Sequence, residues 1–468
     1  MHRIIAIARS KRLNKKKYSK EYDSDECVSS DNEQDISADI VGSIINKYLV
    51  IKYIGKGTFS RVWLVYNLIE GKYYALKKQF AEYYKDGLHE LKMFNIIGNE
   101  CDHLVKLKEY FIITKNEDSS ICFVCELLGS EVFEFIDKYD RKVPISIVKS
   151  WMRDILTAID YIHTKNVIHT DLKLENILLE NIDEKVKNTI DWFNSLNPMD
   201  FIKENSELTE DIDNAHRRRR LRKRLRVKAY KKLALMVKEH SIQQLDTISD
   251  NTSDTTSDNT SDNMSDSMSD NTDKDIIEVN EDSEISTYNL KDDIKEIDFE
   301  EDIDIRVKIC DFGNCCKRDD HIMEEIQTRQ YRSPEVIINN NYDTSSDIWS
   351  LGCILFELIT GEYLFDVAAG KNELDRNRKH LALMYEVLGK MPKKLSMDCE
   401  FSEDYFDAKG RVLKYKKDIN YTNIEELILE ERDDIDKIEL ITICDLLKKM
   451  LGYNPKTRIT AKDCLQEE

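Results

Sequence analysis

The most informative stretch of the chain is Val167–Leu179, which reads V-I-H-T-D-L-K-L-E-N-I-L-L. An apolar lead-in runs into a short polar loop, and an apolar strand follows. In the loop, Asp171 can accept the proton of an attacking hydroxyl, and Lys173 can neutralise charge on a transferring phosphoryl group. Asn176 can offer its amide oxygen to a metal ion. Because phosphoryl transfer needs positioning and charge neutralisation more than covalent chemistry, we predict that Asp171 and Lys173 are catalytic and that Asn176 binds metal.

A glycine-containing hairpin upstream supplies the nucleotide site that such a loop requires. Residues 48–67 form two β-rich runs joined by the turn G-K-G-T-F-S, and the next strand, K-Y-Y-A-L-K, ends in Lys77. Glycines in the turn would let backbone N–H groups approach phosphates. A lone G-x-G more often marks an ordinary hairpin, but here Lys77 follows where a phosphate-binding lysine is expected. The predicted nucleotide-binding residues of this region are Gly55, Lys56, Gly57, Thr58, Phe59, Ser60, Val62, Ala75 and Lys77.

The segment Phe80–Ile97 has helical spacing and carries Glu90 among apolar residues. A carboxylate facing the core from this helix would pair with Lys77 and hold it against the phosphates, whereas a surface glutamate is the ordinary alternative. Farther along, Cys122 and Cys125 have C-x-x-C spacing, but they lie in the strand-like run I-C-F-V-C-E-L-L with no second pair at ligand spacing. We interpret them as residues of a buried strand rather than as a metal or redox site.

The composition indicates a sizeable folded core beside one strongly bipolar segment. Of the 468 residues, 41% are apolar, and no run approaches the roughly 18 to 20 apolar residues that a membrane span needs. The net charge of −20 is uneven, since residues 241–304 hold 21 Asp/Glu against 3 Lys, whereas residues 217–238 hold 12 Lys/Arg and no acid. The apolar patch at residues 4–8 is followed by basic residues, so no secretory signal is predicted. Eleven scattered cysteines indicate reduced thiols, and we expect an intracellular protein of the cytoplasm, the nucleus or both.

Four segments are predicted along the chain. Residues 1–46 are basic and then acidic and Ser-rich, a composition that cannot bury enough surface to fold alone, so we predict a disordered arm. Residues 48–180 and 305–468 are the two folded parts. The insertion between them, residues 181–304, is predicted to be long and largely disordered.

Within the insertion, residues 216–240 place apolar side chains at i, i+4 spacing among many Lys and Arg, which predicts a basic amphipathic helix. Repeated T-S-D, D-N-T and M-S-D units from about Thr247 to Asp273 form an acidic low-complexity tract. The basic helix could be solvated and pair its charges with this tract, bind RNA, or bind a nuclear-import factor. Because no aromatic residues interleave with the basic ones, we expect no direct nucleic-acid partner.

The remaining motifs follow in an order that indicates a family. The run R-V-K-I-C-D-F-G-N contains Asp311, then S-P-E and D-I-W-S-L-G-C follow, with Asp347 placed to brace the catalytic-loop backbone. Together with the hairpin and the H-T-D loop, these elements resemble the eukaryotic protein kinases over residues 48–180 and 305–466. The resemblance implies an α+β, bilobal protein kinase fold, with a small β-rich N-lobe, a larger helical C-lobe and ATP in the cleft. It also implies Mg²⁺ held by Asp311 together with the amide of the catalytic loop.

The same resemblance assigns further residues. The stretch E-L-L-G resembles the hinge between the two lobes, which adds Glu126 and Leu128 to the predicted nucleotide site. Thr328 stands where Ser/Thr kinases bridge the catalytic Asp and Lys. In this family the glutamate of the S-P-E motif, Glu335, is expected to pair with Arg458 of N-P-K-T-R-I-T, as a structural rather than a catalytic contact.

A narrower resemblance is to the SR-protein kinases, which phosphorylate serines in Arg-Ser repeats of splicing factors. The insertion falls where that family carries its spacer, and the matching stretches are H-T-D at 169–171, Q-T-R-Q-Y-R-S at 327–333, T-G-E-Y-L-F at 360–365 and H-L-A-L-M-Y-E-V-L-G-K-M-P-K-K-L at 380–395. The LAMMER kinases share the H-T-D loop but match the Q-T-R-Q-Y-R-S stretch less well. A pseudokinase scaffold is the alternative of another class, and it would need a defect invisible in the sequence, because every residue required for the chemistry is present.

These resemblances imply a Ser/Thr kinase with protein substrates, Arg/Ser-rich proteins among them, and a monomer is the default expectation. Thr170 replaces the Arg that clamps an activation-segment phosphate in many kinases, so we predict activity without activation-loop phosphorylation. The stretch D-R-N-R-K-H departs from the family, because Arg376, Arg378 and Lys379 stand where its substrate-docking groove carries acids. Like charges would repel an Arg-rich peptide. The acids at 373, 375 and 386 are the candidates for compensation.

Overall fold

The computed structural model describes residues 40–467 apart from 116–117, 139–140, 142, 209–213, 251–304, 322, 324, 339–340, 400 and 416–420. The chain divides into one compact unit of residues 1–237 with 304–468, and a second unit of residues 238–303. In the second unit the described residues are the last turns of one helix. Most of the predicted N-terminal arm and nearly all of the acidic tract lie outside the described residues. No helix of the described residues is long and apolar enough to cross a membrane.

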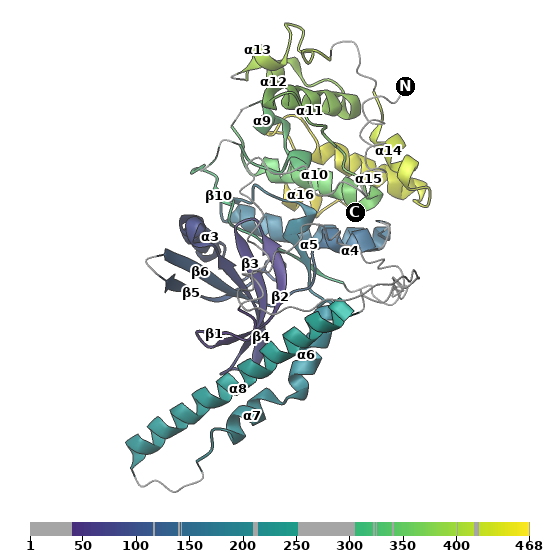
Figure 1. The fold of residues 1–468 in the computed structure, drawn as a ribbon. Coiled ribbons are helices and arrows are strands. Elements are labelled where there is room, and N and C mark those ends of the chain that lie inside the picture. The colour runs from purple at the N-terminus through teal and green to yellow at the C-terminus, as the bar shows by residue number, and fades with distance from the viewer. Residues whose placement is uncertain are drawn as a thin grey trace, which may run out of the picture. The chain divides into compact units, whose positions relative to one another are not determined.

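The N-terminal part is an antiparallel sheet of six strands in the order β1-β2-β3-β4-β6-β5, accompanied by a 14-residue helix, α3 (Figure 1). Its elements are β1 (Ile44–Ile45), β2 (Tyr48–Gly57), β3 (Ser60–Asn67), β4 (Lys72–Gln79), the 3₁₀ turn η1 (Ala81–Tyr83), α3 (Tyr84–Ile97), β5 (Leu107–Lys115) and β6 (Asp118–Cys125). The predicted helix at Phe80–Ile97 is confirmed. Cys122 and Cys125 both lie buried in β6, and burial raises the pKa of each thiol to about 12, as expected for strand residues rather than a reactive pair.

The sheet begins earlier than predicted. Strand β1 pairs with β2 through Ile44 opposite Leu49 and Ile45 opposite Tyr48, and Val41 is buried. The prediction of a disordered arm is therefore wrong over residues 40–46. The short apolar run I-V-G-S-I-I, hidden behind the acidic residues that precede it, adds a strand to the sheet edge and buries its side chains there.

The C-terminal part is mainly helical and begins with α4, and α5 leads into the catalytic loop. Helix α10 is buried on all sides, which explains its apolar sequence W-S-L-G-C-I-L-F-E-L-I. The elements are α4 (Val132–Lys138), α5 (Ile145–Thr164), β7 (Val167–Ile168), η2 (Leu174–Asn176), β8 (Ile177–Leu179), β9 (Val307–Ile309), β10 (Cys316–Lys317), η3 (Arg329–Tyr331), α9 (Pro334–Ile337), α10 (Ser345–Thr360), α11 (Glu373–Leu388), α12 (Lys393–Met397), α13 (Ser402–Tyr405), α14 (Ile424–Glu431), α15 (Lys437–Met450) and α16 (Ala461–Cys464).

The chain leaves the C-terminal part at the start of the insertion and returns beside the same place at its end. Strand β8 pairs with β9, with Ile177 opposite Ile309, although the two residues are separated by the whole insertion. Arg306, just before β9, is fixed by Asp154 of α5, whose two carboxylate oxygens accept from the guanidinium over 2.8 and 2.9 Å. The kinase fold therefore closes behind the insertion without a long irregular connection.

Three helices follow the catalytic loop inside the insertion: α6 (Glu184–Ser195), α7 (Pro198–Glu204) and α8 (Ala215–Asp250). They pack on the N-terminal sheet, where strand residues such as Leu49 and Leu64 share one apolar cluster with Phe193 of α6 and Leu233 of α8 (Figure 1). Polar contacts support this packing. Tyr73 of β4 donates to Asn194 over 2.6 Å, and Lys52 of β2 donates to Thr189 over 3.1 Å, both acceptors lying on α6.

The helix predicted at residues 216–240 is confirmed within α8, whereas the expectation of a largely disordered insertion is corrected over the residues of α6 and α7. The packing also shows that the basic helix is not solvated on every side, since Ala229, Leu233 and Val237 are buried. The sheet face toward α6 carries apolar side chains, and burying them against the apolar rows of the helices is favourable. Disorder of residues 251–304 stays a prediction, because they lie outside the described residues.

Candidate active site

Lys77, Glu90 and Asp311 meet between the sheet and the C-terminal part. Lys77 Nζ lies 2.8 Å from Glu90 Oε1 and 2.9 Å from Asp311 Oδ1. Gln79 Nε2 donates to the other Glu90 oxygen over 2.8 Å. Burial alone lowers the pKa of Lys77, but the carboxylates of Asp311 and Glu90 outweigh it and raise that pKa, so the lysine is charged. The predicted contact between Glu90 and Lys77 is present, and Asp311 joins it.

The glycine-containing hairpin spans the end of β2 and the start of β3, with its turn at Thr58 and Phe59. Gly55, Lys56 and Gly57 end β2, and a Cβ at Gly57 would lie 2.7 Å from the Ser60 hydroxyl. Phe59 is 43% exposed and packs on Tyr83, with ring centroids 4.4 Å apart. The Phe59 ring therefore lies at the turn of the hairpin but is held by Tyr83 of η1.

Val62, Ala75 and Lys77 share one face of the sheet. Val62 pairs with Lys77 across β3 and β4, and Ala75 lies two residues before Lys77 on the same strand. Since Lys77 contacts Asp311, this face is the one turned toward the catalytic loop. Two small or branched apolar side chains beside a cationic one form a surface suited to a flat base next to phosphates.

The catalytic loop holds its three functional side chains close together. Asp171 Oδ1 accepts from the Thr328 hydroxyl over 2.8 Å, and Lys173 Nζ lies 3.4 Å from both Asp171 Oδ2 and Thr328 Oγ1. Asn176 Nδ2 donates to the Asp171 carbonyl over 2.7 Å, which leaves the amide oxygen as the acceptor that a cation would use. The structure thus brings the predicted residues together, with Thr328 as the bridge between Asp171 and Lys173.

The backbone of this loop is held by Asp347, as predicted. Its carboxylate accepts from the backbone N–H groups of His169 and Thr170 over 2.8 and 3.0 Å, and it is fully buried. Thr170 has a φ of 71°, a strained conformation for a β-branched residue. Its hydroxyl donates to the Asn314 carbonyl over 2.8 Å. Sequence reasoning missed this last contact, which ties the catalytic loop to the start of the activation segment.

The hinge is held by a lysine that sequence reasoning also missed. Lys308 of β9 is buried and pairs with Glu126 over 2.8 Å and with Glu180 over 3.2 Å. The Glu126 side chain is therefore turned toward Lys308, so its backbone is the part left to face a nucleotide. Leu128 lies between Glu126 and Gly129. A Cβ added at Gly129 would lie 1.9 Å from the Asn181 carbonyl oxygen. No sequence signal links Lys308 with a glutamate 182 positions away.

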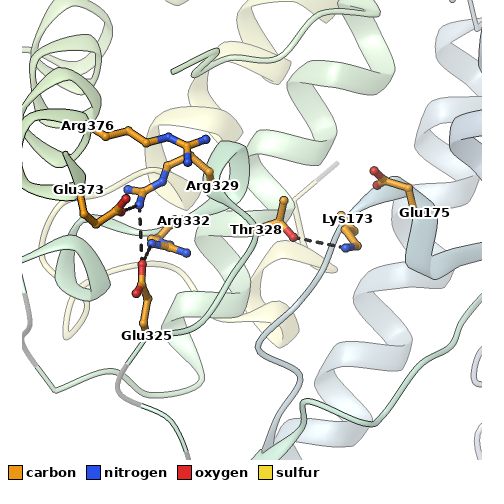
Figure 2. Close-up of a pocket in the computed structure, with 8 residues that line it drawn as sticks. All are labelled: Lys173, Glu175, Glu325, Thr328, Arg329, Arg332, Glu373 and Arg376. Carbon is orange, nitrogen blue, oxygen red and sulfur yellow. Dashed lines mark hydrogen bonds and ion pairs between the residues drawn. The ribbon is translucent and has the colours of Figure 1, made fainter. Parts of the chain in front are cut away.

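A pocket of about 630 Å³ lies beside the catalytic loop. Figure 2 shows Lys173 and Thr328 toward one end and three arginines grouped at the other. Arg329 pairs with Glu373, and Arg332 pairs with Glu325, while Arg376 adds a third guanidinium. The lining residues are Lys173, Glu175, Glu325, Thr328, Arg329, Arg332, Glu373 and Arg376.

The residues of the basic stretch at 376–379 do not form one surface. Arg376 lines the pocket, whereas Arg378 Nε donates to the Asp404 carbonyl over 2.7 Å, and Lys379 lies 3.7 Å from Asp375. Two of the acids considered as compensation are therefore already paired, Glu373 with Arg329 and Asp375 with lysines.

The donors available for a metal ion fit Mg²⁺ bound with a nucleotide. Asp311 offers a carboxylate that is 42% exposed, and Asn176 offers an amide oxygen. Both are oxygen ligands of the kind that Mg²⁺ prefers, and Mg²⁺ usually takes its other ligands from phosphates and water. Among the described residues no group of three or more His, Cys, Asp or Glu could hold a metal ion by itself. The arrangement suits a metal that arrives with a nucleotide.

Comparison with known proteins agrees with this geometry. The family model described as protein kinase domain matches residues 48–192 and 292–468. The chain is 31% identical over 430 residues to Serine/threonine-protein kinase SRPK of Physarum polycephalum, covering 90% of this chain and 85% of that protein. It is 28% identical to SRSF protein kinase 3 of Sus scrofa, covering 91% and 87% of the two chains. It is also 28% identical to protein kinase dsk1 of Schizosaccharomyces pombe, covering 89% and 79%.

The matched segments contain the glycine hairpin, the catalytic loop and the D-F-G motif, and they are interrupted between residues 193 and 291, an interval that includes the end of α6 and all of α7 and α8. The relatives are protein kinases by name, the Physarum protein a serine/threonine-protein kinase, and they align over most of both chains. The chain therefore belongs to the protein kinase family, as a Ser/Thr kinase similar to the SR-protein kinases.

Proposed function

We propose that this kinase transfers the γ-phosphoryl group of ATP, bound with Mg²⁺, to serine hydroxyls in Arg/Ser-rich protein segments, and that it does so without activation-loop phosphorylation. The observation that carries the substrate proposal is the charge distribution beside Asp171, where Glu175 lies at one end of the pocket and three guanidinium groups, two of them paired with Glu325 and Glu373, lie at the other (Figure 2). An Arg-Ser repeat that is being phosphorylated carries both charges in alternation.

In the proposed reaction Asp171 accepts the proton of the attacking hydroxyl, and Thr328 and Asn176 keep its carboxylate and backbone in position. Lys173, beside Asp171, stabilises negative charge on the phosphoryl group in transit, as a charged amine in a cleft can do. Lys77, held by Glu90, would bind the phosphates of the nucleotide. ATP with Mg²⁺ supplies the phosphoryl group and a cation between its phosphates.

The acidic end of the pocket would take a substrate arginine. Glu175 lines the pocket next to Lys173, and Glu131 and Glu134 of the neighbouring segment add charge to the same region. Burial, together with the nearby carboxylates of Glu175 and Glu134, raises the pKa of Glu131 to about 7. A guanidinium placed among these carboxylates would relieve their mutual repulsion and gain charged hydrogen bonds.

The basic end would take a phosphate already present on a neighbouring serine. Burial, with the neighbouring guanidinium groups of Arg332 and Arg376, lowers the pKa of Arg329 to about 9. The Nε atoms of Arg329 and Arg376 are buried without a partner in the described part of the chain. Three guanidinium groups against two carboxylates leave an excess positive charge, which a phosphate would neutralise. Arg376 thus serves the repeat as a phosphate ligand rather than opposing it.

The proposal of phosphorylation-independent activity rests on contacts that already order the activation segment. Thr170 bonds the Asn314 carbonyl, Thr328 bonds Asp171, and Gln327 Nε2 donates to Ser346 and Ser350 over 2.8 Å. None of these contacts requires a phosphate. Phosphorylation by an upstream kinase would therefore not be needed to order the activation segment.

The predicted nuclear-import factor for residues 216–240 remains a prediction, and it is independent of the catalytic proposal. The LAMMER-type kinase and the pseudokinase scaffold are kept as outcomes of the experiment that follows.

Phosphate transfer should be measured with ATP and Mg²⁺ on protein made in bacteria, without pre-activation. The substrates are an Arg-Ser repeat, the same repeat with one serine already phosphorylated, and a basic peptide with a single serine. Asp171→Ala is the inactive control, and Arg376→Gln tests the basic end of the pocket. We expect transfer that depends on Asp171, preference for the repeat, and a further gain from the phosphorylated serine that Arg376→Gln removes.

Equal transfer to both unphosphorylated peptides would refute the Arg/Ser-rich substrate and favour a LAMMER-type specificity. Transfer only after treatment with an upstream kinase would refute phosphorylation-independent activity. If the protein neither transferred phosphate nor bound ATP with Mg²⁺, the pseudokinase scaffold would be the function that remains.

A further inference from the structure

Helix α8 carries a dense basic surface that the kinase reaction does not use. Residues 217–232 contain 11 Lys/Arg and no acid. Sixteen helical residues extend about 24 Å, so the positive charges average one per ~2.2 Å of axis. B-form DNA carries one negative charge per ~1.7 Å, a closely similar linear density. Arginines predominate at the start of the helix, and their planar fork suits phosphate oxygens.

The basic side chains surround most of the helix. The exposed ones are Arg217, Arg219, Arg220, Arg222, Lys223, Arg224, Arg226, Lys228, Lys231 and Lys232. At 100° per residue these ten side chains leave no gap wider than about 80° around the circumference, between Lys232 and Arg222. Leu221 and Leu225 are half-buried, and the packing on the sheet is made farther along the helix, by Tyr230, Leu233, Ala234 and Val237. The helix is therefore anchored through residues 230–237, and the turns before them carry basic side chains around most of the circumference.

This distribution discriminates between anionic partners. A lipid surface contacts one side of a helix and takes up an apolar stripe there, but the apolar row of α8 is already packed inside the protein. A groove with phosphates along both walls contacts a wide arc at once. An α-helix with side chains is ~10–12 Å across, and the major groove of B-form DNA is ~12 Å wide, whereas the major groove of A-form RNA is narrow and deep.

We propose that the exposed face of α8 between Arg217 and Lys232 binds the major groove of double-stranded DNA, without sequence preference. This revises the expectation of no nucleic-acid partner. That expectation relied on the absence of interleaved aromatic residues, which matters for single strands, whose bases stack on aromatic rings. A duplex presents its phosphates without unstacking, so charge and helical shape suffice.

The test compares two full-length variants that lose the same charge. The α8 variant carries Arg217→Gln, Arg219→Gln, Arg220→Gln, Arg222→Gln, Arg224→Gln and Arg226→Gln, substitutions that keep helix propensity. The matched control carries Lys72→Gln, Lys393→Gln, Lys394→Gln, Lys409→Gln, Lys456→Gln and Lys462→Gln, all exposed and away from α8. Fluorescence anisotropy measures Kd from 50 to 300 mM salt for a 24-base-pair DNA duplex of mixed sequence. The same is done for the RNA duplex of that sequence, polyglutamate and anionic lipid vesicles.

We expect the wild type and the control to bind DNA with a steep salt dependence, and the α8 variant to lose about 100-fold in affinity. The slope of log K against log salt should fall by about 5, since each lost phosphate contact accounts for ~0.9. Methylation protection at guanine N7 should report the major groove, and all three proteins should phosphorylate a short peptide equally. Equal DNA binding by the two variants, or tighter binding to polyglutamate, vesicles or RNA than to DNA, would overturn the proposal.

Discussion

Two buried ion pairs in this kinase have the same chemistry and different surroundings. Arg458 and Glu335 are 0% and 2% exposed, and their two parallel contacts are 2.6 and 2.8 Å long. Arg458 also donates to the Ser345 and Gly452 carbonyls. Four of its five N–H groups are thus directed into protein, and its side chain is buried away from any ligand.

The pair of Lys77 and Glu90 is open on one side. Glu90 is 1% exposed, but Lys77 is 23% exposed and is shared with Asp311, which is 42% exposed. The lysine can therefore exchange Asp311 for a phosphate without unfolding anything. We therefore expect the sealed pair to contribute to stability and the pair with one accessible partner to contribute to activity.

The largest effect is expected at the sealed pair. Arg458→Met leaves the Glu335 carboxylate buried without a cation, and we expect the free energy of unfolding to fall by about 3–5 kcal/mol. Urea unfolding measures the change, and activity per folded molecule should stay near that of the wild type. Glu335→Leu combined with Arg458→Met should recover much of the loss, because no charge is then left alone. A double variant as unstable as the single one would contradict this account of the pair.

At the open pair we expect the substitution to lower kcat strongly and the free energy of unfolding less. Lys77→Met removes the cation expected to hold the phosphates, and we expect kcat to fall about 10²- to 10³-fold. The free energy of unfolding should change less than in Arg458→Met, since Glu90 can take up a proton and keep its bond from Gln79. Lys78→Met is the matched control, because Lys78 lies on the opposite face of β4. Comparable loss of activity in both variants would show that the open pair has no special role.

Gly87 tests how the open pair is positioned. A Cβ at this residue of α3 would lie 2.0 Å from Gln79 Oε1 and 2.2 Å from Ile121 Cγ2, and Gln79 is the residue that holds Glu90. Gly87→Ala should therefore displace Gln79, cost about 1–3 kcal/mol of stability and lower kcat as well. Thermal unfolding and steady-state kinetics measure the two effects. Gly452→Ala, whose added Cβ would make only an ordinary contact at 3.6 Å, should be nearly neutral in both.

Most of the candidate active site was predictable from sequence because its parts are local. Asp171, Lys173 and Asn176 lie in one loop, and their spacing predicts their roles. Lys77 ends the predicted strand K-Y-Y-A-L-K. Glu90 required one tertiary inference, namely which face of α3 meets the sheet. Apolar periodicity was sufficient for that step.

What sequence reasoning missed depends on partners far apart in the chain. The docking of α6 and α8 on the sheet could not be foreseen, since a helical pattern shows an apolar row but not the surface that covers it. Lys308 looks like any residue of a short strand until the fold brings Glu126 and Glu180 to it. The same holds for Thr170, whose neighbour Asn314 is 144 positions away.

Like the two ion pairs, Thr170 joins segments that are far apart in the chain, but it does so through a neutral hydrogen bond. Thr170→Val keeps the β-branched shape and removes the hydrogen bond to the Asn314 carbonyl, so the activation segment loses one of its ties. We expect kcat to fall about tenfold, with KM for ATP nearly unchanged. Thr170→Ser retains the hydroxyl and should restore most of the activity. A serine variant as slow as the valine variant would point to backbone strain rather than the hydrogen bond.

The smallest effect concerns Glu131, a carboxylate that is largely buried beside two others. Its pKa is raised to about 7, chiefly by burial, so the group is neutral at pH 6 and ionised at pH 8. Because a substrate arginine is attracted only by the ionised form, KM for an Arg-Ser peptide should fall about three- to fivefold as the pH rises through 7. Folding stability should change in the opposite sense, since a raised carboxyl pKa favours the folded state at low pH and that contribution is lost as the pH rises toward and past 7. Glu131→Gln should flatten both pH profiles, and a KM that still fell with pH in this variant would assign the effect to another group.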